Sequence, residues 1–131
     1  MPAADLPAVA ASLDAVHERL DALFADGEVP DDDRFRFSTA VAEVAANIVE
    51  HSRAGTTFSV ALDLDAERIE ATFEDDAEAV DATVLDRPMP DDQAERGRGM
   101  AILRGAVHEV RYERVGERNR WTLVRWLRSG S

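Results

Sequence analysis

Three polar residues in the segment EVAANIVEHS are spaced so that they can act together. Glu43, Asn47 and His51 recur every fourth residue, which places a carboxylate, an amide and an imidazole along one face of a helix. A carboxylate and an amide oxygen suit a hard cation such as Mg²⁺, which keeps waters and binds substrate phosphates. The carboxylate can also accept the proton of an attacking hydroxyl. The same spacing is typical of a boundary helix that carries three solvated polar side chains.

Two other segments carry groups that suit a nucleotide. In ERGRGMAIL, Gly97 and Gly99 precede a predicted helix, so backbone N–H groups can approach a phosphate at a helix start. Arg96 and Arg98 add fixed positive charge at the same place. Asp75 stands at the end of a predicted strand, where its carboxylate can accept a hydrogen bond from the amino group of a purine. Taken alone, Asp75 also fits a charged turn.

The elements that must position these residues follow from the apolar pattern. Spacings of three and four predict helices, and strict alternation predicts strands. Three acidic residues, Asp31, Asp32 and Asp33, are expected to cap the second helix. The expected elements are helices over 5–25 and 31–52, a strand hairpin over 58–64 and 69–73, a loop over 76–97, a short helix over 99–105, and strands over 107–114 and 120–127 joined through Gly116 and Asn119.

This order of elements predicts the α+β class, with helices on one face of a mostly antiparallel sheet. Residues 1–131 are expected to form a single domain, because a chain of 131 residues has room for one core. The loop over 76–97 is rich in acidic residues and poor in apolar ones, so we expect a mobile lid over a nucleotide. The alternative is a fixed loop packed on the sheet through its few apolar residues.

Composition excludes several classes of protein. The chain has no cysteine, which rules out a disulfide scaffold and a thiol nucleophile, and all 15 basic residues are arginine, which rules out a P-loop lysine. The net charge of −12 argues against direct nucleic-acid binding. Residues 95–131 are basic, with nine arginines against four acidic residues, which suits phosphate, an acidic partner or a solvated surface. No membrane-length apolar run and no signal peptide are visible, so a cytoplasmic location without membrane contact is expected.

Taken together, the three segments resemble the ATP-binding domain of the GHKL superfamily, which includes gyrase, Hsp90, histidine kinases and MutL. AVAEVAANIVEHS is similar to the superfamily's N-box, and GRGMAILRGAVHEVRY to its second glycine box and the strand that follows. The resemblance covers about residues 6–127. Within the superfamily, the chain most resembles the stand-alone anti-sigma factor serine kinases of the RsbW and SpoIIAB type. The resemblance implies a two-layer α/β sandwich of the GHKL (Bergerat) type.

The resemblance also implies roles for individual residues. It makes Glu43 the catalytic general base, Asn47 a Mg²⁺ ligand and Asp75 the adenine-binding residue. The other cofactor-binding positions that it implies are Ala77, Ala79, Arg96, Gly97, Arg98, Gly99 and Met100. The implied cofactors are ATP and Mg²⁺. The implied partners are a sigma factor and a STAS-type anti-sigma-factor antagonist, which the kinase phosphorylates on serine. The spacing over 5–25 is also compatible with a homodimer.

The chain departs from the superfamily pattern at three places. The usual first strand is not predicted, because MPAADLP is short and rich in proline. Ala77 and Ala79 replace glycines of the first glycine box, where a methyl group can crowd the nucleotide or forbid a positive φ. His108 replaces a common aspartate in a predicted strand, where a structural role is expected.

The two alanines keep a second function open. The chain can be a GHKL-fold regulatory binding module that keeps the fold and the partner surface but has lost or weak kinase activity. The catalytic domain of a histidine kinase is a third candidate, although the sequence contains no helical hairpin with a phospho-accepting histidine. Intact Glu43 and Asn47, together with the second glycine box, favour the serine kinase.

Overall fold

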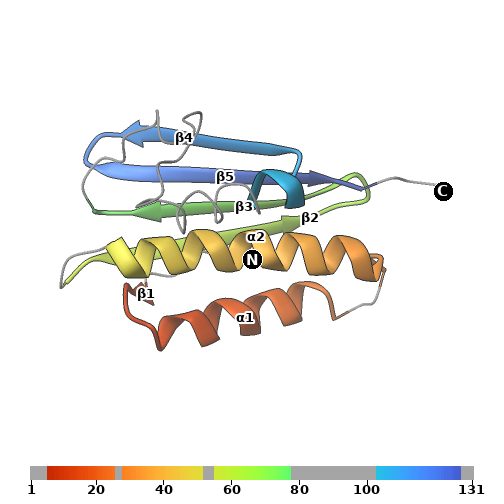
Figure 1. Ribbon diagram of the computed structural model, residues 1–131, viewed down its shortest axis with the longest axis horizontal. Helices are drawn as coiled ribbons and strands as arrows, with labels where there is room; N and C mark the ends of the chain where they lie inside the picture. Colours follow the sequence, from red (N-terminus) through yellow and green to blue (C-terminus); the bar gives the residue numbers. More distant parts are fainter. Residues whose placement is uncertain (1–5, 26–27, 52–54, 78–102, 128–131) are drawn as a thin grey trace, which may run out of the picture.

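The computed structural model describes residues 6–25, 28–51, 55–77 and 103–127. The side chain of His51 lies outside the description, although its backbone ends a helix. In Figure 1 the helices lie beside a sheet, and the helix over residues 31–51 runs along the length of the molecule. The elements are β1 (Leu6–Pro7), α1 (Ser12–Leu23), α2 (Asp31–His51), β2 (Thr57–Leu64), β3 (Arg68–Asp75), β4 (Glu109–Val115) and β5 (Arg118–Trp126).

One sheet contains all five described strands, in the order β1-β2-β3-β5-β4, and each neighbouring pair is antiparallel. Helices α1 and α2 lie on the same side of this sheet (Figure 1). The structure therefore confirms the predicted α+β class, with helices on one face of an antiparallel sheet. Strand β3 follows the predicted alternation of inward and outward residues. In β2, Phe58, Val60 and Leu62 are buried as predicted, but Ser59 is buried as well.

The core fills the space between the helices and the sheet. Phe37 and Val41 of α2 are fully buried, as are Ala71 and Phe73 of β3. Burial of apolar side chains is the main favourable term in folding, so this contact holds the two layers together. The same inward side of β3 ends in a polar residue, Asp75, which is 2% exposed. The sheet thus presents one carboxylate to the buried layer at the point where β3 ends.

The N-terminal segment differs from its prediction. Leu6–Pro7 form strand β1 against β2, and α1 begins at Ser12 rather than near residue 5. Pro7 suits the edge of a sheet because it has no N–H to donate. The Ser12 hydroxyl donates a hydrogen bond of 2.6 Å to the Pro7 carbonyl, which ties the helix start to the strand. Leu6 and Val9 therefore do not lie on the apolar face of the helix predicted over 5–25, and Val9 is 49% exposed.

Helix α2 begins with the three aspartates that were expected to cap it. They occupy its first turn, where the positive end of the helix dipole stabilises negative charge. Asp31 pairs with Arg34 on the same helix, and Asp33 pairs with Arg125 of β5 at 2.8 Å. The acidic cluster thus also connects the helix to the sheet.

Two turns connect the described hairpins. Between β2 and β3, the Asp65 carboxylate accepts hydrogen bonds from the backbone N–H groups of Glu67 and Arg68, at 2.7 and 2.9 Å. Between β4 and β5, Gly116 has a φ of +62°, a left-handed conformation that favours glycine. The prediction that Asn119 belongs to this turn is wrong, because the tight turn ends before Arg118. Asn119 lies in β5 and is 1% exposed.

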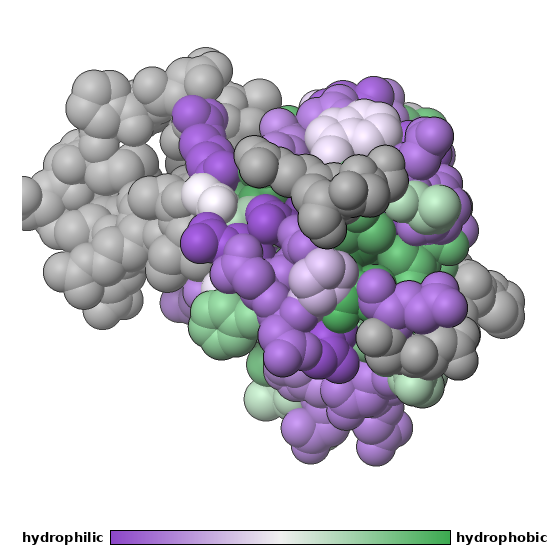
Figure 2. All heavy atoms as spheres, turned by 90° about the vertical axis from the view of Figure 1, so that its right-hand side faces the viewer, coloured by the Kyte–Doolittle hydropathy of each residue, from purple (hydrophilic) through white to green (hydrophobic). Residues whose placement is uncertain are grey.

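The predicted loop over 76–97 and its function as a lid lie largely outside the described residues, as does the start of the predicted short helix. Residues 103–106 are helical, close to the predicted end at 105. Figure 2 faces the end of the molecule where α2 begins and β5 ends. Most residues coloured there are hydrophilic, and the largest hydrophobic area lies to the right of the centre, with smaller ones elsewhere (Figure 2).

Candidate functional site

Asp75 is a buried carboxylate at the C-terminal end of β3. Its Oδ1 accepts a hydrogen bond of 2.9 Å from the Asn119 side-chain amide and one of 3.0 Å from the Ala77 backbone N–H. Asn119 lies directly opposite Asp75 in the β3–β5 register. Both hydrogen bonds that the described residues make to this carboxylate end on Oδ1, so Oδ2 has no protein donor among them. A carboxylate oxygen without a protein donor can accept a hydrogen bond from a ligand.

Asn119 is itself held by two residues of β4. The Tyr112 hydroxyl donates to Asn119 Oδ1, and Arg114 Nη1 donates to the same oxygen at 3.1 Å. Arg114 also donates to the Ala77 carbonyl at 2.8 Å. Together these residues form a cluster that we name the Asp75 cluster, and its members are Asp75, Ala77, Tyr112, Arg114 and Asn119.

Ala77 is the first of the two alanines in the degenerate glycine box. Among the described residues, no residue other than glycine has a positive φ, so the Ala77 backbone does not need glycine for its conformation. Its N–H and its carbonyl are both hydrogen bonded within the Asp75 cluster. The conformational objection to alanine therefore does not apply at this position. Ala79 lies outside the described residues.

Glu43 and Asn47 lie on α2, one turn apart. The helix is continuous from Asp31 to His51, so the predicted spacing on one face is real. Both side chains are half-buried, whereas Val44 and Ile48 beside them are buried. The two polar residues therefore stand on the rim of the core, as predicted. In Figure 1, the C-terminal part of α2 and the C-terminal end of β3 lie toward the same end of the molecule.

The donors on α2 fit a magnesium ion that also binds phosphate. Asn47 offers an amide oxygen and Glu43 a carboxylate, and Mg²⁺ uses few protein ligands because it keeps waters and substrate phosphates. No cluster of three or more histidine, cysteine, aspartate or glutamate residues that could hold a metal occurs in the described part of the chain. The arrangement thus suits a metal that arrives with a phosphorylated substrate rather than one bound by protein alone.

A family model for the histidine kinase-like ATPase domain matches residues 6–126 of the chain. The chain belongs to the histidine kinase-like ATPase domain family. This membership confirms the GHKL-type ATPase domain that the N-box and the second glycine box predict. It implies ATP binding, typically together with Mg²⁺. A comparison with curated proteins finds no match.

Three solved structures have a similar fold. The histidine kinase domain of a blue-light activated histidine kinase from Erythrobacter litoralis EL346 is 18% identical, with a TM-score of 0.59 over 91% of this chain and 60% of that one. The RsbU and RsbW domains of Rv1364c from Mycobacterium tuberculosis are 20% identical, with a TM-score of 0.64 over 98% of this chain and 33% of that one. The mycobacterial sensor histidine kinase MprB is 18% identical, with a TM-score of 0.55 over 95% and 97%. The chain thus spans less than two thirds of the first two structures.

The second glycine box of this histidine kinase-like ATPase domain falls outside the described residues. Arg96, Gly97, Arg98, Gly99 and Met100 are therefore not placed. The segment directly after the box is anchored from several sides. Ala106 is its last helical residue, and the Ala106 carbonyl accepts a hydrogen bond of 2.8 Å from the Arg125 side chain. The box thus leads into a segment that is fixed to β5.

His108 has the structural role that was expected of it. The imidazole Nδ1 of His108 accepts a hydrogen bond of 2.8 Å from the Trp126 backbone N–H. The backbone N–H of His108 donates to the Val124 carbonyl at 2.8 Å. The histidine thereby extends the ladder between β4 and β5 by one step. It takes part in sheet pairing and has no contact with the Asp75 cluster among the described residues.

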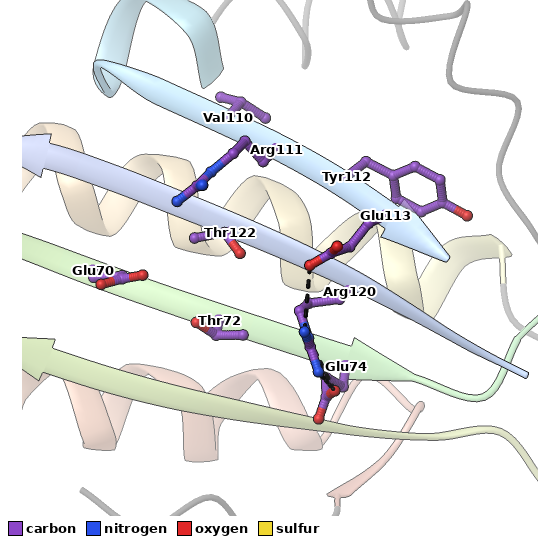
Figure 3. A pocket seen from close by; sticks show the side chains of 9 residues that line it. All are labelled: Glu70, Thr72, Glu74, Val110, Arg111, Tyr112, Glu113, Arg120 and Thr122. Atoms are coloured by element: carbon purple, nitrogen blue, oxygen red, sulfur yellow. Dashed lines mark hydrogen bonds and ion pairs between the residues drawn. The ribbon is translucent and has the colours of Figure 1, made fainter. Parts of the chain in front are cut away.

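A shallow hollow of about 690 Å³ lies on the open face of the sheet. There Arg120 lies between Glu74 and Glu113, at 3.0 and 3.3 Å, and the hydrogen bond to Glu74 raises the pKa of Arg120 (Figure 3). The remaining lining residues are Glu70, Thr72, Val110, Arg111, Tyr112 and Thr122. Glu43, Asn47 and Asp75 do not line this hollow, although Tyr112 of the Asp75 cluster does.

Sequence reasoning missed three members of the Asp75 cluster. Asn119 closely follows Gly116 and was predicted to belong to the turn, and no role was predicted for Tyr112 or Arg114. One signal was present in the sequence: Asn119, Trp121 and Leu123 alternate, so Asn119 shares the inward side of β5. A polar residue at an inward position needs a buried partner, and Asp75 has the same inward parity in β3.

None of the helices in the described residues is both long enough and apolar enough to cross a membrane. The longest, α2, carries three aspartates in its first turn and has Glu43 and Asn47 at the edge of the core.

Proposed function

We propose that this histidine kinase-like ATPase domain is an ATP-dependent protein serine kinase and anti-sigma factor. In this proposal it phosphorylates an anti-sigma-factor antagonist in a partner-switching system. The observation that carries the nucleotide part is the buried Asp75 carboxylate, with one oxygen held by the protein and the other open. The partner part is supported by the resemblance to RsbW and SpoIIAB and by the fold likeness to a structure that contains an RsbW domain.

Asp75 recognises the base of ATP in this proposal. The 6-amino group of adenine donates a hydrogen bond to Asp75 Oδ2, the oxygen without a protein donor among the described residues. A hydrogen bond from a neutral donor to a buried carboxylate is stronger than one between neutral groups. Ala77 and Ala79 follow as the first glycine-box positions, and they line the nucleotide with backbone and methyl groups.

Asn47 and the second glycine box hold the phosphates. Asn47 contributes its amide oxygen to Mg²⁺, which neutralises phosphate charge when bound. Gly97, Gly99 and Met100 offer backbone N–H groups at a helix start. Arg96 and Arg98 add positive charge near the same oxygens.

Glu43 acts as the general base for transfer. The hydroxyl oxygen of the antagonist's serine attacks the γ-phosphorus, its proton passes to the Glu43 carboxylate, and the bond to the bridging oxygen of ADP breaks. Little covalent work remains for the protein, so positioning and charge neutralisation supply most of the catalysis. The unphosphorylated antagonist then competes with a cytoplasmic sigma factor for the kinase, which is the partner switch.

A transfer assay with a matched control tests the proposal. The chain, ATP, Mg²⁺ and a panel of STAS-type antagonist proteins are mixed, and phosphoserine is measured by mass spectrometry. Glu43→Gln should lower the transfer rate by about 10² to 10⁴ while ATP affinity in calorimetry changes little. Glu67→Gln, on an exposed side chain in the β2–β3 turn, should change neither. Equal transfer rates for Glu43→Gln and the wild type would remove Glu43 from the mechanism.

The second candidate is a regulatory binding module without efficient transfer. Ala77 and Ala79 favour it, because they stand where glycines let the backbone approach a nucleotide. In that case the chain binds a sigma factor or antagonist, while no STAS-type protein in the panel becomes phosphorylated. ATP binding without transfer would support this candidate. A wild-type chain that gains no thermal stability with millimolar ATP would contradict nucleotide binding in both proposals.

A further inference from the structure

The Asp75 cluster is more elaborate than packing requires. Asp75 and Asn119 are 2% and 1% exposed, and polar groups this deep lose stability unless each finds a partner. Two residues of the next strand, Tyr112 and Arg114, supply those partners. An apolar residue at position 119 would fill the same space without any of these hydrogen bonds. The cluster therefore needs a reason beyond the core.

The donors in the cluster dictate how the Asn119 amide is oriented. The Arg114 guanidinium can only donate, so the oxygen of the amide must face Arg114, and Tyr112 donates to the same oxygen. The NH₂ group of Asn119 then faces Asp75 Oδ1. Rotation of the amide would place two donors against each other, so the orientation is fixed by charge as well as by shape.

This orientation fixes the Asp75 carboxylate in turn. Oδ1 is occupied by Asn119 and by the Ala77 N–H, which leaves Oδ2 as the open acceptor. Arg114 also holds the Ala77 carbonyl at 2.8 Å, so the backbone that follows Asp75 cannot shift independently. An acceptor in a fixed place selects a base edge that donates there. Adenine has an amino group at position 6, which can donate to Oδ2. Guanine has a carbonyl oxygen at this position, and two acceptor oxygens that face each other repel.

We infer that Asn119, held by Tyr112 and Arg114, is a positioning residue that orients the Asp75 carboxylate toward the 6-amino group of adenine. The inference rests on the proposed function, in which Asp75 binds the base. Tyr112 and Arg114 act at one further remove, from the edge strand β4. Their side chains stiffen the start of the degenerate glycine box through Asn119 and the Ala77 carbonyl.

A ligand-side thermodynamic cycle tests this inference. Calorimetry compares ATP with purine riboside triphosphate, which lacks the 6-amino group, for the wild type, Asn119→Ala and Tyr112→Phe. The wild type should bind ATP about 10- to 100-fold more tightly than the analogue, the range expected for one hydrogen bond to a charged group. In Asn119→Ala this ratio should fall to about threefold or less, because the carboxylate is no longer oriented. Tyr112→Phe, which keeps its ring against Trp121 at 4.9 Å, should give an intermediate ratio.

Thr122→Val is the matched control, because Thr122 lies on the same strand as Asn119 and lines the hollow on the open side of the sheet, and no side-chain hydrogen bond joins it to the cluster in the described residues. It should keep the wild-type ratio. Variants that lose affinity for ATP and the analogue equally would show a purely structural cluster and overturn the inference alone. A wild type that binds neither nucleotide would overturn the proposed function and this inference with it. Thermal melting establishes that Asn119→Ala is folded, and Tyr112→Phe decides the matter if it is not.

Discussion

At the two ends of β5, a half-buried carboxylate, Asp33, and a buried one, Asp75, are held by different kinds of partner. At its C-terminal end, Arg125 forms an ion pair of 2.8 Å with Asp33 of α2. At its start, Asn119 gives Asp75 of β3 a hydrogen bond of 2.9 Å from a neutral amide, and no ion pair of the described residues includes Asp75. An arginine neutralises a carboxylate and occupies it, whereas a neutral donor leaves its charge available.

The residues around Arg125 form a structural cluster, which we name the Arg125 cluster and which consists of Asp33, Ala106, His108, Arg125 and Trp126. Arg125 connects α2 to β5 and also holds the Ala106 carbonyl. His108 extends the pairing of β4 and β5 by accepting a hydrogen bond from the Trp126 N–H. These contacts of Arg125 join elements of the fold to one another. This difference is the basis for proposing Asp75, and not Asp33, as the carboxylate that binds a ligand.

The largest expected effect concerns stability at the Arg125 cluster. Arg125→Ala leaves Asp33 and the Ala106 carbonyl without their donor. Removing one partner of a buried ion pair costs about 3–5 kcal/mol, and this pair is partly exposed, so we expect a loss of about 2–3 kcal/mol in the free energy of unfolding. Chemical denaturation measures it. Arg111→Ala, a control on the open face, should change stability by less than about 0.5 kcal/mol.

The ATP affinity of Arg125→Ala decides what this first result means. If the cluster is structural, the remaining folded protein keeps its preference for ATP over the analogue without the 6-amino group. A loss of that preference together with stability would mean that the two ends of β5 are not separate in function.

A paired substitution tests the comparison directly, with a somewhat smaller effect. Asp75→Asn should weaken ATP binding by about 10- to 100-fold. The substitution removes the negative charge and places an amide NH₂ where Oδ2 would accept from the 6-amino group. Its amide oxygen can still accept from Asn119 and Ala77, so the free energy of unfolding should change by less than about 1 kcal/mol. Asp33→Asn should do the reverse and lower stability with ATP affinity intact. Two variants that both lose only stability would contradict the distinction between the clusters.

The sequence predicted the elements whose pattern is local. The alternation Phe58, Val60, Leu62 is the alternation of buried residues in β2, and the spacing of Glu43 and Asn47 follows from one continuous helix. The short strand β1 was missed because two residues, one of them proline, carry no periodic signal. Its pairing depends on the β2 edge and not on its own propensity.

The Asp75 cluster could be predicted only in part, for a related reason. Asp75 was found because it ends an alternating strand, and the residues that hold it come from 37 to 44 positions further along the chain. No local pattern specifies which inward residue of β5 meets Asp75, since the register depends on how two hairpins meet. Asn119 also follows Gly116, and asparagine next to glycine is typical of turns. Tertiary pairing thus decided its place.

A third carboxylate provides the smallest test of the comparison. Asp65 accepts hydrogen bonds from the backbone N–H groups of Glu67 and Arg68 in an exposed turn, and these hydrogen bonds lower the pKa of Asp65 below its usual 3.8. Like Asp75, it is held mainly by neutral donors. Unlike Asp75, it is exposed to solvent, so water competes for its charge and little stability should depend on it.

The pH dependence of this turn separates the contributions of charge and geometry. Because the folded-state pKa of Asp65 is lowered, its contribution to stability is present above the unfolded pKa and is lost as the pH falls through the folded pKa. An NMR titration of the Asp65 side-chain carbon should give a midpoint below 3.8. Asp65→Asn keeps an acceptor oxygen for both N–H groups, so the small stability difference from wild type should shrink between about pH 5 and about pH 2. A midpoint at or above 3.8 would mean that neutral backbone donors do not favour the charged form. The comparison of Asp65 with Asp75 through their neutral donors would then fail.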